Sequence, residues 1–160
     1  MRELPLFGGN GRAPRRTTGQ PPWRLLTDWT TAAGLDGSGL LALVAGGRAA
    51  EGIHLATLGY ETIVIHPDDA AAEAAEQAAH VHHVAADPAD LPAEWILRFD
   101  LVLAVDVAPP VEVLAAQGIL VALTAAAVET PDGLVEVDHE WGADPDESGT
   151  ERHRTVLARL

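Results

Sequence analysis

Cysteine and lysine are both absent from the 160-residue sequence, and each absence excludes a group of reactions. Without cysteine the chain forms no disulfide, no thiolate zinc site and no cysteine nucleophile. Without lysine it has no Walker A phosphate loop, no Schiff-base lysine and no tyrosine–lysine dehydrogenase pair. Phosphate-loop nucleotide hydrolysis and covalent catalysis by lysine or cysteine are therefore excluded.

Long hydrophobic runs are also missing. A membrane-spanning helix needs about 18 to 20 consecutive apolar residues, and no stretch of the sequence approaches that length. The N-terminal residues 1–5 lack an apolar signal core, so we expect a cytoplasmic protein without membrane association. The length and the 48% hydrophobic composition suit a single domain, which we place at residues 23–160.

The net charge of -14 is divided unevenly along the chain. Residues 1–24 contain five arginines and one glutamate, whereas residues 25–160 contain five arginines and 23 carboxylates. Residues 1–22 are rich in arginine, proline and glycine and are predicted to form a flexible arm. Because the acidic body repels phosphate backbones, nucleic acid is a poor candidate for a partner.

From residue 40 onward, short apolar runs alternate with helix-forming stretches. The predicted strands are 40–44, 62–65, 81–85, 99–105 and 119–123. The predicted helices are 23–33, a segment ending at Leu58, 67–79 and 111–117. Strands that are apolar throughout are buried on both faces, and their separation by helices predicts a parallel, doubly wound, Rossmann-like α/β sheet.

The C-terminal part has a different pattern. Residues 134–141 alternate apolar or aromatic residues with Glu136, Asp138 and Glu140, which predicts a strand with one face in solvent. Residues 152–160 alternate again, so the two stretches are predicted to form an antiparallel hairpin that completes the sheet. His139 and His153 are expected to face each other across this hairpin.

The segment after the first predicted strand is the expected ligand site. Doubly wound sheets bind ligands outside the carboxyl ends of their strands, where the strand order reverses. Gly46 and Gly47 allow the backbone to approach a nucleotide, and the amides of the next helix face the ligand. A ribose-binding side chain is expected about 20 residues further on, where His66 stands. The alternative is that both glycines form a simple tight turn.

Four segments together resemble a known family. They are residues 41–61, 84–92, 99–106 and 117–123. Their order and spacing resemble the class I S-adenosylmethionine-dependent methyltransferases, and within them the small tellurite-resistance-type branch. The resemblance covers residues 40–160. It implies a shortened form of that fold, because residues 124–133 are too few for the helix that the family places there.

The resemblance also implies S-adenosylmethionine as cofactor, with the aspartate after the third strand holding the adenine. The residues implied to bind it are Ala45, Gly46, Gly47, His66 and Asp87. Several positions depart from the family pattern. Leu43 stands where the family usually has an acidic residue, Ala45 and Ala49 replace loop glycines, and His66 replaces a carboxylate that accepts both ribose hydroxyls.

Two functions are compatible with these residues. The first is methyl transfer to a small-molecule acceptor, with Asp106 after the fourth strand orienting the acceptor or taking its proton. In the alternative interpretation Asp106 only caps the turn at residues 108–110. The second function is that of a non-catalytic methyltransferase-fold protein that acts as a binding or regulatory partner of another protein. The sequence carries no signal for an oligomeric state.

Three histidines, His80, His82 and His83, lie close together in the sequence. A strand places His83 on the opposite face from the other two, and no carboxylate follows at a recognised metal-ligand spacing. We therefore expect surface histidines and no metal site.

Overall fold

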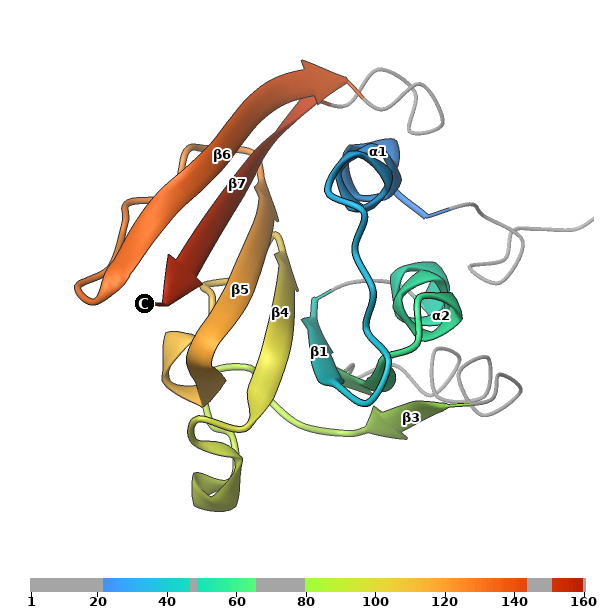
Figure 1. The fold of residues 1–160 in the computed structure, drawn as a ribbon. Coiled ribbons are helices and arrows are strands. Elements are labelled where there is room, and N and C mark those ends of the chain that lie inside the picture. Colours follow the sequence, from blue (N-terminus) through green and yellow to red (C-terminus); the bar gives the residue numbers. More distant parts are fainter. Residues whose placement is uncertain (1–21, 47–48, 66–79, 144–150, 160) are drawn as a thin grey trace, which may run out of the picture.

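The computed structural model describes residues 22–46, 49–65, 80–143 and 151–159 of the protein. These residues contain one seven-stranded sheet with the order β3-β2-β1-β4-β5-β7-β6 (Figure 1). Strands β1 to β5 pair in parallel, and β7 is antiparallel to both β5 and β6. The predicted fold class, with its antiparallel end, is confirmed. The strands are β1 (Leu41–Ala45), β2 (Glu61–Ile65), β3 (Val81–Val84), β4 (Phe99–Val105), β5 (Leu114–Thr124), β6 (Leu134–Ala143) and β7 (Glu151–Arg159).

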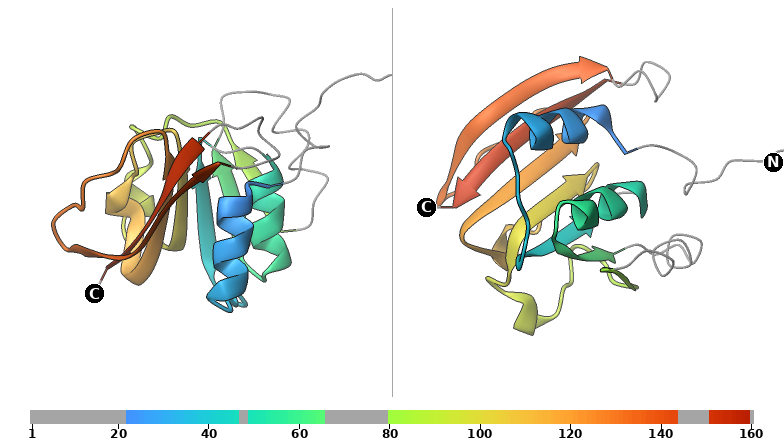
Figure 2. Two further views of the ribbon diagram at one scale, coloured as in Figure 1. Left: turned by 90° about the horizontal axis from the view of Figure 1, so that it is seen from above. Right: turned by 45° about the vertical axis from the view of Figure 1, so that its right-hand side comes forward.

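Two helices cover the same face of the sheet, as Figures 1 and 2 show. They are α1 (Arg24–Ala32), which ends where Gly34 adopts a φ of 62°, and α2 (Ala49–Thr57). Leu26 from α1 and Leu55 from α2 are fully buried in the core on this face. No helix among the described residues is long and apolar enough to cross a membrane.

A second core lies on the opposite face of the sheet. In β1, Ala42 and Val44 belong to the first core, whereas Leu43 and Ala45 belong to the second. This burial on both faces explains why β1 is apolar at every position. The helix predicted at 67–79 lies outside the described residues.

The helix predicted at 111–117 is wrong. Only Val111–Val113 forms a 3₁₀ turn, and β5 begins at Leu114. Leu114 pairs with Phe99 of β4, and Arg159 donates hydrogen bonds to the carbonyl oxygens of Val111 and Leu114. A continuing helix would use those carbonyls internally, so contacts with distant parts of the chain replace the local preference.

A bulge in β6 corrects the predicted alternation of the hairpin. The register with β7 shifts between Glu136 and Asp138, which leaves Val137 59% exposed. Side chains alternate between the two faces of β6 on each side of the bulge, but the extra residue exchanges the faces, so the alternation does not continue across it. Val135 consequently lies on the same face as Asp138, and not on the face of Trp141.

Candidate functional site

The strand order reverses between β1 and β4, and several predicted site residues meet there. From β1 the sheet extends through β2 to β3 on one side, and through β4 to β5 on the other. Ala45 is the last residue of β1, and Gly46 follows it. Asp106 follows the last residue of β4. The structure thus brings these three residues to the carboxyl edge, where doubly wound sheets bind ligands.

Gly46 is required by the close approach of the two strand ends. Its φ is 77°, in the left-handed region that glycine adopts without strain. A Cβ at this position would lie 2.3 Å from the carbonyl oxygen of Val105 and 2.8 Å from a methyl carbon of Val107. The backbone after β1 is therefore pressed against the end of β4. Gly47 lies outside the described residues.

Asp106 also has a left-handed backbone, with a φ of 56°. Its backbone N–H donates to the carbonyl oxygen of Leu123, so the residue stays attached to the end of β5. Its side chain is 44% exposed and forms an ion pair with Arg152, at 3.0 Å between Oδ2 and Nη2. Within the part of the chain that the structure describes, this carboxylate bonds to Arg152 and to no group of the turn at 108–110.

Arg152 is a site residue that the sequence reasoning missed. Its side chain is only 18% exposed, and Nη1 donates to the carbonyl oxygen of Glu151. The guanidinium lies 5.4 Å from the centre of the Trp23 ring, within the range of a cation–π interaction. Among the residues that the structure describes, its Nε is buried and has no hydrogen-bond partner. The sequence did indicate its position, because an antiparallel last strand begins at the carboxyl edge of its parallel neighbour. The first residues of the predicted last strand, Arg152 among them, are therefore expected at the ligand edge.

Trp23 is held in turn by a buried carboxylate. Its backbone N–H donates to Oε2 of Glu51 at 3.2 Å, and Glu51 is fully buried in the first turn of α2. Glu51, Trp23 and Arg152 therefore connect α2 to Asp106. This series of contacts fixes the position of the guanidinium.

A cavity of about 530 Å³ opens beside this ion pair. Asp106 and Arg152 are the charged residues in its wall. The other lining residues are Val107, Ala108, Pro109, Thr124, Ala125, Ala126 and Val128. Val107 also contacts the position of Gly46, so the cavity adjoins the loop after β1.

Asp87 lies beyond β3, exposed to solvent. Its Oδ1 accepts a hydrogen bond from the backbone N–H of Ala89, and its carbonyl oxygen accepts one from Asp90, both at 2.9 Å. The turn therefore fixes one carboxylate oxygen and leaves Oδ2 for another group. Asp87 thus follows the third strand as Asp106 follows the fourth. His66 lies outside the described residues.

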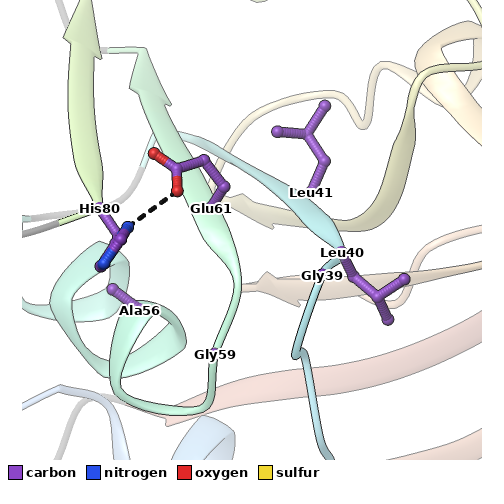
Figure 3. Close-up of a pocket in the computed structure, with 7 residues that line it drawn as sticks. All are labelled: Gly39, Leu40, Leu41, Ala56, Gly59, Glu61 and His80. Carbon is purple, nitrogen blue, oxygen red and sulfur yellow. Dashed lines mark hydrogen bonds and ion pairs between the residues drawn. The ribbon is translucent and has the colours of Figure 1, made fainter.

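A second cavity, of about 460 Å³, lies at the opposite edge of the sheet (Figure 3). Glu61 and His80 line it, with 2.9 Å between Oε1 and Nδ1. His82 contacts the other oxygen of the same carboxylate, and hydrogen bonds from His82 and His80 lower the pKa of Glu61. Among the described residues, no group of three or more histidines and carboxylates could hold a metal ion.

His80 and His82 therefore lie on one side of β3, as their spacing predicts. The carboxylate that joins them was not anticipated, because Glu61 precedes them by about 20 residues on the neighbouring strand. This cavity is at the amino ends of β1 and β2. Ligands of doubly wound sheets bind at the other edge.

Comparisons with known proteins identify the fold. No protein-family profile matches the sequence, and no curated protein sequence matches it. The solved magnesium protoporphyrin IX methyltransferase ChlM of Synechocystis PCC 6803, with bound SAM, is similar with a TM-score of 0.61 and 17% identity, covering 85% of this chain and 77% of that one.

Two further methyltransferases have the same architecture. A 1,6-didemethyltoxoflavin-N1-methyltransferase of Burkholderia thailandensis, solved with S-adenosylhomocysteine, has a TM-score of 0.62 and 15% identity, covering 86% of this chain and 77% of that one. The antibiotic-resistance methyltransferase Kmr has a TM-score of 0.57 and 13% identity, covering 82% and 93%. The chain thus has a shortened form of the class I methyltransferase fold.

Proposed function

We propose that the protein is an S-adenosylmethionine-dependent methyltransferase for a small-molecule acceptor, related to the tellurite-resistance-type branch. The observation that carries this proposal is the strand edge at Gly46. There, a backbone that has no room for a side chain meets a cavity with a carboxylate and a guanidinium in its wall. This arrangement suits a ligand that lies along the backbone and an acceptor placed beside it.

The proposed cofactor would lie along the backbone that follows β1, where Gly46 is exposed. The backbone at Gly46 and Gly47 would contact the methionine part, and Ala45, which is fully buried, would hold this backbone in place. His66 would accept a hydrogen bond from one ribose hydroxyl, and the free carboxylate oxygen of Asp87 would accept one from the adenine amino group. When bound, S-adenosylmethionine supplies a methyl group that its sulfonium has already activated.

Asp106 is the proposed catalytic residue. Its second carboxylate oxygen is open to the cavity and could accept a hydrogen bond from the hydroxyl or amine of an acceptor. Because the methyl group needs no further activation, the main task of the site is to align the acceptor. The left-handed backbone and the hydrogen bond from its N–H to the carbonyl oxygen of Leu123 place Asp106 at the cavity for this task.

A non-catalytic role is the second candidate, and two observations favour it. Leu43 and Ala45 are fully buried in the second core, so the positions that differ from the family pattern serve the packing of the sheet. The described residues between β5 and β6 contain no helix, so one side of the cavity lacks an element that the family has. Such a protein would bind a protein partner without turning over a substrate.

Calorimetric titration with S-adenosylmethionine and S-adenosylhomocysteine tests the proposal. Both ligands should bind in the micromolar range, at about 8 kcal/mol, and should raise the melting temperature. Asp87→Ala should weaken binding by about 1 to 3 kcal/mol, because it leaves a polar group of the ligand unmatched. Asp132→Ala, an exposed carboxylate in the turn before β6, is the control and should leave the affinity unchanged.

His66→Asp separates the two candidates. A carboxylate accepts hydrogen bonds from both ribose hydroxyls, so this variant should bind more tightly than the native chain. If neither protein binds either ligand at millimolar concentration, the methyltransferase proposal is wrong and the non-catalytic role replaces it.

A further inference from the structure

The ion pair between Asp106 and Arg152 is asymmetric, and this asymmetry bears on what the cavity binds. The carboxylate of Asp106 is 44% exposed, whereas the side chain of Arg152 is 18% exposed. Asp106 can turn toward solvent and be hydrated there at little cost. Arg152 cannot, because Trp23 and the carbonyl oxygen of Glu151 hold it in place.

From this difference we infer that the cavity binds a small apolar acid, whose carboxylate pairs with Arg152. The inference rests on the proposed function, since it names the chemical class of the methyl acceptor. A ligand carboxylate would take over or share the place of Asp106 on the guanidinium. Arginine presents a planar fork of donors that suits a carboxylate, and both Arg152 and the Asp106 carboxylate that its Nη2 contacts line the cavity.

A cationic ligand is disfavoured by the same geometry. An ammonium group that bound the open oxygen of Asp106 would place a second positive charge beside the largely buried guanidinium, and one that replaced Arg152 on Asp106 would leave that guanidinium without this charged partner. Uncompensated buried charge is strongly destabilising. An anion leaves only the exposed carboxylate of Asp106 unpaired, and water can solvate it.

The rest of the wall indicates an apolar ligand body. Apart from the ion pair and Thr124, the lining consists of alanine, valine and proline side chains. The hydroxyl of Thr124 is already bonded to the carbonyl oxygen of Ala126 at 2.6 Å. The volume of about 530 Å³ accommodates a ligand with one or two rings.

Ligand-detected NMR titration of the full chain without S-adenosylmethionine tests the inference. Benzoate, benzamide and benzylamine have nearly the same shape and differ in charge. Benzoate should bind at millimolar concentration, and the other two should bind at least about 10-fold more weakly, as expected for loss of a charged hydrogen bond. Arg152→Gln should reduce benzoate binding by about 10-fold, and Arg98→Gln, which changes an exposed arginine, should not reduce it.

Asp106→Asn supplies a second variant with the opposite expectation. Asparagine tolerates the left-handed backbone, so the fold should be retained. Removal of the competing carboxylate should strengthen benzoate binding by about 3-fold to 10-fold. Equal binding of benzoate and benzamide, no effect of Arg152→Gln, or weaker binding to the Asp106→Asn variant would each overturn the inference.

The result is distinguishable from failure of the proposed function. Benzoate binding without S-adenosylmethionine binding would leave an anion site on a non-catalytic protein. Binding of S-adenosylmethionine without any preference for benzoate would retain the methyltransferase proposal and refute this acceptor class.

Discussion

Arg154 joins the C-terminal hairpin to helix α1, and its replacement by methionine should lower the free energy of unfolding. Arg154 is 6% exposed. Its Nη1 donates to the carbonyl oxygen of Leu25 at 2.9 Å, and Nη2 contacts Asp138 at 2.6 Å and Glu140 at 2.7 Å. Methionine keeps the apolar length of the side chain and removes every one of these bonds.

The size of the effect follows from the burial of each partner. The bond to the Leu25 carbonyl is buried, and a charged hydrogen bond of this kind contributes about 2 kcal/mol. The carboxylates of Asp138 and Glu140 are 40% and 57% exposed, so each ion pair adds only about 0.5 to 1 kcal/mol. The buried methionine recovers about 1 kcal/mol. The net loss should be about 2 to 3 kcal/mol.

Urea denaturation followed by tryptophan fluorescence measures this loss. Arg98→Met is the matched control, because Arg98 is exposed and, within the described part of the chain, its side chain makes one bond, to the carbonyl oxygen of Glu94 at 3.2 Å. The control should change the free energy of unfolding by less than about 0.5 kcal/mol. If Arg154→Met costs no more than this control, the hairpin and α1 are not joined as described.

Three further variants test other parts of the structure. Gly46→Ala should lower the free energy of unfolding by about 2 to 4 kcal/mol in urea denaturation, whereas Gly34→Ala, with a similar φ and no atom within 4 Å of the added Cβ, should cost only about 1 kcal/mol. Burial lowers the pKa of His54, so the unfolded chain takes up the proton first. Stability should therefore fall as the pH drops below the ordinary value of 6.5, and melting curves of His54→Gln should lack this part of the fall. The pKa of Glu61 is also lowered, so its contribution is present above the ordinary value of 4.5 and is lost at lower pH. Glu61→Gln should reduce the acid sensitivity of the melting temperature in that range, and an unchanged profile would contradict the contacts with the two histidines.

The parallel part of the fold was predictable because its pattern has a direct physical cause. Strands with both faces buried must be apolar throughout, and the sequence from Leu41 to Ala45 satisfies this requirement. The connection at 111–117 was not predictable, because Leu114 becomes part of β5 through its pairing with Phe99 and the bonds from Arg159. Both contacts join residues far apart in the sequence, and local propensity contains no information about them.

The candidate site was also predictable in part, namely in the residues that directly follow the predicted parallel strands. Gly46 and Asp106 follow predicted strands, and a general rule on doubly wound sheets places such residues at the ligand edge. Arg152 was missed because an arginine in an alternating strand carries no local signal of the carboxylate that it reaches, and the antiparallel direction of the last strand indicates only the edge at which it lies. The bulge at Val137 was missed for the same reason, because it depends on the register between β6 and β7 and not on the local sequence.

The paired left-handed residues Gly46 and Asp106 restrict which sequences can form this edge. At position 46 the adjacent Val105 carbonyl leaves room for glycine alone. At position 106 the φ of 56° favours aspartate, asparagine or glycine over other residues. Diverged relatives can thus be sought by two conditions together, even where the other glycines of the loop are replaced. The first condition is a glycine directly after the first strand. The second is aspartate, asparagine or glycine directly after the fourth strand.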